Sequence, residues 1–192
     1  MGRHKIAILV SGSGTNAINI IEYFEKKSIA DVTLVVSNKT DALAVERVQN
    51  RSVKTIVFNN ESFKKNGEVL NCLKSELIDF IVLAGFLIKV PDDIIYAYPN
   101  KIVNLHPSLL PKYGGKGMYG SRVHRAVIEA QETESGISIH FVNEEYDEGK
   151  IIFQAKVSIE RKDSLEELTQ KIQQLEHRFF PKVIEQVISK SL

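Results

Sequence analysis

Two polar side chains interrupt an apolar run in the segment IVNLHPSLLPKY, residues 102–113. Asn104 and His106 are two residues apart, and in a strand such neighbours project to the same side. An amide beside an imidazole can stabilise a developing oxyanion and move a proton, which is the chemistry of acyl transfer. A polar strand end without a catalytic role explains the same pair, and for the pair taken alone it is the better explanation.

A third candidate is Asp147, which lies in the acidic loop EEYDEG between two apolar segments. A carboxylate in that loop could orient the His106 imidazole or hold a water molecule that relays protons. His140 alternates with apolar residues in SIHFV, a pattern that predicts a structural strand residue. No HExxH, CxxC or other clustered ligand spacing is present, so the sequence predicts no metal site.

The glycine-rich segment SGSGTN follows the first apolar run and precedes an amphipathic stretch. Backbone N–H groups at a helix N-terminus form a phosphate site, and Thr15 and Asn16 add side-chain donors. The segment therefore predicts a phosphate-binding loop, with a plain strand-to-helix turn as the alternative.

A dinucleotide site is a second interpretation of this loop. Gly12, Gly14 and Ala17 satisfy the pattern G-x-G-x-x-[GA] between a strand and a helix. A nicotinamide site also expects an acidic residue at the end of the second strand, which here ends VVSNKT. Lys39 could bind a 2′-phosphate, so an NADP site stays open.

Apolar runs alternate with helical patterns through residue 106. Strands are predicted at 5–10, 32–37, 54–58, 80–85 and 101–106, and helices at 16–27, 41–50, 61–77 and from Pro91. Continuous apolar strands between helices predict a parallel sheet that is covered on both faces. Such sheets bind ligands beyond the carboxyl ends of their strands, and Asn104 and His106 lie at such an end.

The pattern changes after residue 120. A helix at 121–131 precedes strands at 136–143 and 150–159, and the loop between these strands is too short for a crossover helix. We therefore expect an antiparallel addition to the sheet. A long helix follows, capped by Asp163 or Ser164 with an acidic first turn.

Length and composition indicate one domain over residues 1–192 with an ordinary balance of 43% apolar and 26% charged residues. The net charge of +1 argues against a non-specific nucleic-acid binder. Cys72 is the single cysteine, and its helical context predicts a packing residue in a reducing compartment. Without a secretory signal or a membrane-spanning run, the expected location is the cytoplasm and no membrane partner is expected.

Six segments in order support a family resemblance: SGSGTN, VSNK, LAGF, NLHPSLLPKY, SIHFVNEEYDEGKII and LEHRFFP. Together they resemble the phosphoribosylglycinamide formyltransferases, over nearly the whole chain. The pattern N-x-H-P-S-L-L-P marks the wider family of formyltetrahydrofolate-using enzymes. The resemblance implies an α/β, Rossmann-like three-layer fold with a mostly parallel central sheet, an antiparallel C-terminal part and a long C-terminal helix.

The resemblance also implies a reaction in de novo purine synthesis. A formyl group would pass from 10-formyltetrahydrofolate, as co-substrate, to the amine of glycinamide ribonucleotide, without a metal. Asn104 and protonated His106 would stabilise the oxyanion, and Asp147 would hold His106 or an ordered water. His106 would also pass a proton toward the departing folate nitrogen. The implied partners are small molecules only, with the protein a monomer or a homodimer.

The same match implies the binding residues. Gly14, Thr15 and Asn16 would hold the substrate phosphate, and Glu176 would bind the ribose hydroxyls. The folate site would comprise Lys65, Leu87, Ile88, Lys89, Val90, Asn104, Asn143, Glu144, Glu145, Tyr146 and Asp147. Leu110-Pro111 falls where the family carries a cis proline.

Three departures from the family pattern concern these contacts. The family often carries Arg at the position of Ile88, where the nearest cation here is Lys89. The basic residue that meets the folate carboxylates falls at Lys64 or Lys65. The longer segment GGKGMYGSRV replaces a short Pro-Gly loop after PKY.

Three alternatives are open. Formyltetrahydrofolate deformylases have a regulatory domain before the first strand, and here that strand begins at residue 5. Methionyl-tRNA formyltransferases add a C-terminal domain that we do not expect here. A non-catalytic nucleotide-binding module would need only the glycine loop and would leave Asn104, His106 and Asp147 unexplained.

Overall fold

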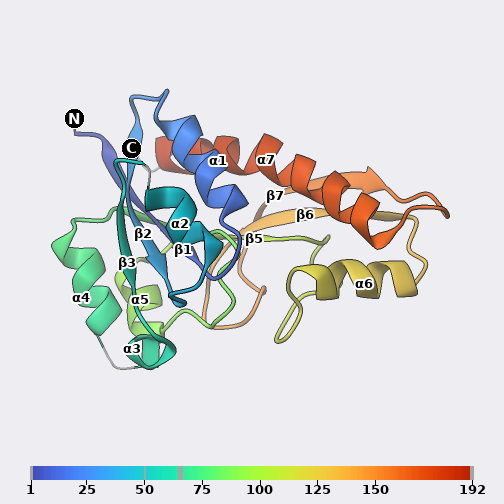
Figure 1. Cartoon of the computed structure of the whole chain (residues 1–192), viewed down its shortest axis with the longest axis horizontal. Coiled ribbons are helices and arrows are strands. Elements are labelled where there is room, and N and C mark those ends of the chain that lie inside the picture. The colour runs from blue at the N-terminus through green and yellow to red at the C-terminus, as the bar shows by residue number, and fades with distance from the viewer. Residues whose placement is uncertain (1, 50, 65–66, 191–192) are drawn as a thin grey trace.

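A computed structural model describes residues 2–49, 51–64 and 67–190. Seven strands form one sheet in the order β3-β2-β1-β4-β5-β6-β7 (Figure 1). The strands are β1 (His4–Val10), β2 (Ala30–Ser37), β3 (Lys54–Val57), β4 (Phe80–Leu83), β5 (Ile102–His106), β6 (Glu134–Phe141) and β7 (Ile151–Ser158). The helices are α1 (Thr15–Phe24), α2 (Leu43–Gln49), α3 (Asn60–Lys64), α4 (Glu68–Ser75), α5 (Asp92–Ala97), α6 (Ser121–Glu129) and α7 (Leu165–Lys190).

The pairing of the strands confirms the predicted change of direction along the chain. β1 to β5 pair in parallel, whereas β6 pairs antiparallel with both β5 and β7. The turn between β6 and β7 leaves no room for a crossover helix, and a short connection of this kind requires antiparallel neighbours.

Both faces of the sheet are buried, which explains the unbroken apolar runs. On β1, Ile6 and Ile8 belong to one hydrophobic core and Ala7 and Leu9 to the other. α1, α2, α6 and α7 contribute to the first core, and α3, α4 and α5 to the second. Figure 1 shows α7 running along the sheet beside α1, with which it packs. The expected three-layer α/β fold is therefore confirmed.

The single helix predicted over residues 61–77 is wrong. The structure has two helices there, α3 and α4, and Gly67 caps α4 with a φ of 91°. That backbone conformation is left-handed and cannot continue a right-handed helix. In the sequence Gly67 weakens the helical pattern, but apolar residues keep a helical spacing on both sides of it, so a single helix was predicted.

A reciprocal cap starts α7. The Ser164 N–H donates to Glu167 Oε2 at 2.7 Å, and the Glu167 N–H donates to Ser164 Oγ at 3.2 Å. This is the capping box expected from the sequence, with Ser164 rather than Asp163 as the cap. Asp163 instead forms an ion pair with Lys171 at 2.5 Å. Within the described residues, no helix has both the length and the apolar character needed to cross a bilayer.

Candidate active site

β5 and β6 present four polar side chains on one face of the sheet. Asn104 pairs with His140 across the two strands, and His106 pairs with Ser138. Val103 and Leu105 point into the core beneath α7, so the alternate residues of β5 point to the opposite face. Asn104 and His106 therefore project together, at the carboxyl end of a parallel strand.

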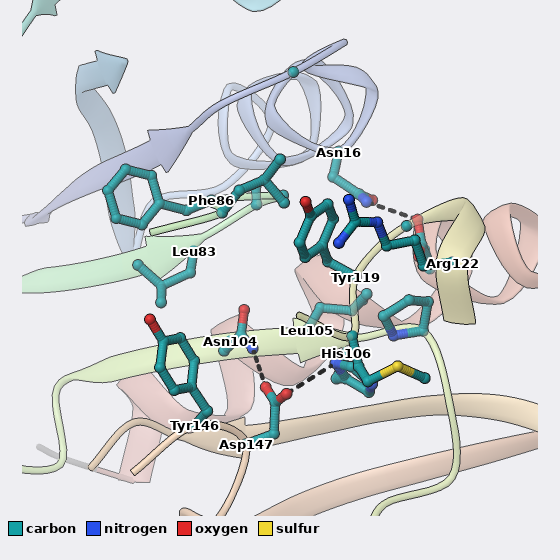
Figure 2. A pocket seen from close by; sticks show the side chains of 18 of the residues that line it. Asn16, Leu83, Phe86, Asn104, Leu105, His106, Tyr119, Arg122, Tyr146 and Asp147 are labelled. Atoms are coloured by element: carbon teal, nitrogen blue, oxygen red, sulfur yellow. Dashed lines mark hydrogen bonds and ion pairs between the residues drawn. The ribbon is translucent and has the colours of Figure 1, made fainter. Parts of the chain in front are cut away.

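Asp147 reaches both side chains from the loop between β6 and β7. Its Oδ2 lies 3.4 Å from His106 Nδ1, and its Oδ1 accepts from the Asn104 amide at 3.3 Å (Figure 2). The backbone N–H of Gly115 donates to the same carboxylate at 2.9 Å. The structure thus brings together Asn104, His106 and Asp147, a proximity that spacing in the sequence could not establish.

The backbone of this loop depends on a close approach at Gly149. A Cβ atom at position 149 would stand 1.7 Å from the carbonyl oxygen of Phe141, closer than any real contact allows. Asp147 itself has a φ of 58°, in the left-handed region that few non-glycine residues adopt. The loop can therefore fold tightly over β6 and turn the carboxylate back toward β5.

His140 belongs to this cluster, which corrects its reading as a structural strand residue. It is 2% exposed, and its Nδ1 lies 2.8 Å from the carbonyl oxygen of Phe141. A carbonyl only accepts and an amide nitrogen only donates, so Nδ1 carries a hydrogen toward Phe141 and Nε2 accepts from the Asn104 amide at 3.1 Å. The signal that could have found it is the antiparallel register, which places His140 opposite Asn104.

The Asn104 amide nitrogen is therefore fully engaged. Its two hydrogens serve His140 Nε2 and Asp147 Oδ1, and Figure 2 shows its carbonyl oxygen pointing away from Asp147. A donor toward a bound oxyanion becomes available when the longer contact, the one with Asp147, is exchanged for the ligand.

The partners of the two ring nitrogens indicate which nitrogen of His106 carries the hydrogen. Its Nε2 lies 2.7 Å from the carbonyl oxygen of Tyr113, so this nitrogen donates and Nδ1 is left to accept a proton. Burial lowers the pKa of His106, and the nearby charge of Asp147 opposes that shift without cancelling it. A lowered pKa favours the neutral imidazole, and the protonated form that the resemblance implies stays a prediction.

Asp147 is ionised in the same site. Burial alone would raise the pKa of its carboxyl group, but His140, His106 and the Gly115 N–H together lower it. An anionic carboxylate beside His106 stabilises the imidazolium that forms when Nδ1 takes up a proton.

After Pro107 the chain turns back toward His106. Ser138 Oγ accepts from the Leu110 N–H at 2.9 Å and donates to the Ser108 carbonyl at 2.7 Å. The Leu110-Pro111 peptide bond is cis, at the position expected from the family. These contacts place the Tyr113 carbonyl oxygen against the imidazole.

The glycine loop lies at the N-terminus of α1. Gly14 has a φ of 74°, and a Cβ atom there would stand 2.6 Å from that of Ala44. The Arg47 guanidinium donates to the Ser13 carbonyl at 2.8 Å, which holds the loop from outside. The backbone amides before Thr15 are thus available to an anion.

Asn16 connects the glycine loop to α7. Its amide donates to Glu176 Oε2 at 2.8 Å, whereas the buried Asn16 Oδ1 has no protein partner among the described residues. Burial raises the pKa of Glu176, and the hydrogen bond from Asn16 opposes the shift. A carboxyl and an amide oxygen side by side are acceptors suited to ligand hydroxyl groups.

These groups open onto one cavity of about 780 Å³. It includes the glycine loop, the catalytic candidates and most of the predicted binding residues: Gly14, Thr15, Asn16, Leu87, Ile88, Lys89, Val90, Asn104, His106, Asn143, Glu145, Tyr146, Asp147 and Glu176. Sequence reasoning missed Tyr119, Arg122 and His124 in this wall, because only the fold brings α6 to it.

Two candidate folate contacts, Glu144 and Lys64, are not part of the cavity wall. Glu144 does not line it and instead interacts with Tyr96. Lys64 is exposed and forms an ion pair with Glu61 at 2.8 Å. Lys65 lies outside the described residues. Lys89 lines the cavity and ion-pairs with Asp92 at 3.4 Å.

Two other expectations can be compared with this geometry. Lys39, the residue that could have served an NADP phosphate, is exposed and does not line the cavity. In the described part of the chain, no group of three or more His, Cys, Asp or Glu residues could hold a metal ion.

Comparison with known proteins decides the family. A family model described as "Formyl transferase" matches residues 4–184. The chain belongs to the formyl transferase family. This formyl transferase is 40% identical over 185 residues to "Phosphoribosylglycinamide formyltransferase" of Haemophilus influenzae, covering 94% of the chain and 85% of that relative. It is 38% identical over 188 residues to "Phosphoribosylglycinamide formyltransferase, chloroplastic" of Arabidopsis thaliana, covering 95% of the chain.

Solved structures agree with this membership. The formyl transferase matches the crystal structure of phosphoribosylglycinamide formyltransferase from Bacillus halodurans with a TM-score of 0.89 and 38% identity, over 98% of this chain and 97% of that one. The chain spans 64% of the length of the Arabidopsis relative and 60% of one from Vigna unguiculata.

Proposed function

We propose that this formyl transferase moves a formyl group from 10-formyltetrahydrofolate to the amine of glycinamide ribonucleotide. One observation carries the proposal: the glycine loop and the Asn104–His106–Asp147 cluster open onto the same cavity. A phosphorylated amine anchored at Gly14 could then extend to a reacting centre near His106. The names of the relatives support the same substrate.

The size and lining of the cavity suit two small ligands. Its volume of about 780 Å³ falls within the range of sites that enclose such molecules. The wall near Asn104 is apolar and aromatic, with Leu83, Phe86, Val90 and Tyr146. A flat ring system such as a pteridine fits that wall, and the Asn143 and Glu145 loop beside it offers polar groups.

The proposed step balances as an acyl transfer. The amine nitrogen attacks the formyl carbon and forms a new C–N bond, and the carbonyl oxygen becomes an oxyanion. His106 Nδ1 takes the proton that the amine releases and passes it to the folate nitrogen N10 as the bond from N10 to carbon breaks. Asp147 stabilises the transient imidazolium.

Asn104 is the proposed oxyanion donor. Exchange of its contact with Asp147 for the oxyanion would leave His140 holding the other amide hydrogen, so the amide keeps its orientation. One such donor contributes about 3 kcal/mol, or roughly a hundredfold in rate.

A deformylase is the principal alternative, because water could replace the amine as nucleophile in the same cluster. Incubation of the purified protein with 10-formyltetrahydrofolate, with and without glycinamide ribonucleotide, separates the two activities. We expect release of tetrahydrofolate that requires the amine, and loss of most of this turnover in His106→Ala with folding retained. Release at an equal rate without the amine would favour the deformylase.

Three further expectations stay predictions. The single domain over residues 1–192 was inferred from length and pattern, and the choice between monomer and homodimer is open. We expect the protein to act in the cytoplasm, although the names of two plant relatives carry the word chloroplastic.

A further inference from the structure

The segment GGKGMYGSRV, which departs from the family pattern, contributes Tyr119 and Arg122 to the cavity wall. We propose that Arg122, stacked on Tyr119, is a second anchor for the phosphate of the amine substrate and selects a phosphorylated amine over an unphosphorylated one. This inference rests on the proposed function. It adds a cationic side chain to a phosphate site whose other predicted donors, the backbone amides and the side chains of Thr15 and Asn16, are uncharged.

The position of Arg122 fits this role. It is the second residue of α6, and it lines the same cavity as Gly12, Gly14 and Asn16. Figure 2 shows Arg122 and Asn16 toward one end of the cavity and Asp147 toward the other. A positive charge at that end would lie near the bound phosphate and away from the reacting centre.

The aromatic ring of Tyr119 holds the guanidinium in place. The Arg122 Cζ lies 4.7 Å from the ring centroid, within the range of a cation–π contact. Gly120, with a φ of 52°, allows the backbone to turn between the two residues. A stacked guanidinium keeps its donors free at its edge and loses less side-chain entropy when it binds a ligand.

The charges of the cavity wall show why a cation is needed. Three carboxyl groups line it, from Glu145, Asp147 and Glu176, and they disfavour a dianion. Lys89 is paired with Asp92, whereas none of the ion pairs within the described ranges includes Arg122. Arg122 is therefore a free cation on the substrate side.

Lys116 is the other cation of the wall without an ion pair in the described structure, but it is less suited. Like Arg122 it is exposed, but it lies between Gly115 and Gly117, and no ring contact orients it. Arginine also presents a planar set of donors that binds two phosphate oxygens at once, whereas lysine acts as a point charge.

The test compares a phosphorylated and an unphosphorylated substrate. Steady-state constants are measured with glycinamide ribonucleotide and with its nucleoside, for the wild type, Arg122→Gln and Arg122→Lys. We expect Arg122→Gln to raise KM for the nucleotide about tenfold or more, with kcat nearly unchanged and the nucleoside unaffected. Arg122→Lys should be intermediate. Arg125→Gln is the matched control, because Arg125 is exposed on the same helix and does not line the cavity.

A binding assay separates this proposal from the formyl transfer. Calorimetric titration with ribose 5-phosphate, without folate, should give weaker binding to Arg122→Gln than to the wild type. If Arg122→Gln binds ribose 5-phosphate more weakly but the wild type shows no formyl transfer, the phosphate anchor is supported and the proposed formyl transfer is contradicted. Equal losses for nucleotide and nucleoside, or ribose 5-phosphate binding that does not depend on Arg122, would overturn the proposal.

Discussion

At the residue scale, proton transfer depends on how His106 is held between Tyr113 and Asp147. Its Nε2 donates to a carbonyl group, so Nδ1 is the nitrogen that can take up a proton. Burial lowers the pKa of His106 while Asp147 raises it, so the carboxylate tunes the base as well as orienting it. Asn104 has a comparable arrangement, with His140 fixing one of its hydrogens.

Asp147→Asn tests this tuning. Because the charge of Asp147 raises the pKa of His106, its loss should lower that pKa further and move the acid limb of the pH–rate profile to lower pH. The rate on the plateau should fall by roughly a hundredfold, since the imidazolium loses its counter-charge. A pH series of kcat/KM measures both effects.

The matched control is Glu148→Gln, which removes an exposed carboxylate from the same loop. It should leave the profile unchanged. An acid limb in Asp147→Asn that stays in place or moves to higher pH would contradict the assigned role.

At the element scale, strand alternation could be read from the sequence, but contacts between elements could not. The alternation placed Asn104 and His106 on one side of a strand. The register that sets His140 opposite Asn104 depends on residues more than 30 positions apart, so no local pattern reported it. Gly67 was recognised as a weak point of one helix, but its left-handed backbone conformation could not be predicted, since the apolar spacing continues on both sides of it.

Gly149→Ala tests the loop that carries Asp147. The added methyl group would stand 1.7 Å from the Phe141 carbonyl oxygen, so the loop must move and carry Asp147 away from His106. We expect a loss of about 1–3 kcal/mol in stability and a greater loss of activity than of folded protein. Thermal unfolding and kcat/KM, measured together, check this.

Glu148→Ala, next to Gly149 and exposed, is the control for this variant and should change neither quantity. A Gly149→Ala protein with wild-type activity would show that the close approach does not position Asp147.

At the scale of the whole molecule, the cavity joins the first strand–helix loop, the ends of β4 and β5, α6 and the last helix. The sequence predicted the sheet and the long helix, because each has a local pattern. The predicted binding residues that line the cavity came from the family resemblance. Lys89, a predicted folate contact, lines the cavity. The place of Lys64 outside the cavity and of Arg122 within its wall could not be predicted, because both depend on the packed fold.

Buried histidines make stability depend on pH. Burial lowers the pKa of His106, His124 and His177, so the unfolded chain binds more protons than the folded one just below pH 6.5. Glu176 acts in the opposite direction because its pKa is raised, but one group opposes three. The free energy of unfolding should therefore fall as the pH drops from 7 through the lowered histidine pKa values.

Thermal unfolding at pH 7.5 and pH 5.5 measures this dependence. We expect a lower Tm at pH 5.5, at roughly 2–4 °C for each kcal/mol lost. A Tm that is equal or higher at pH 5.5 would show that these histidines are not held in the neutral form by the fold.

The most direct test of the central claim follows the formyl carbon itself. Purified protein is mixed with glycinamide ribonucleotide and 10-formyltetrahydrofolate labelled with ¹³C in the formyl group, and the products are observed by NMR. We expect the label to appear on the amine nitrogen of the nucleotide, with one tetrahydrofolate formed for each amine formylated. Label recovered as formate, at a rate that the nucleotide does not change, would contradict it.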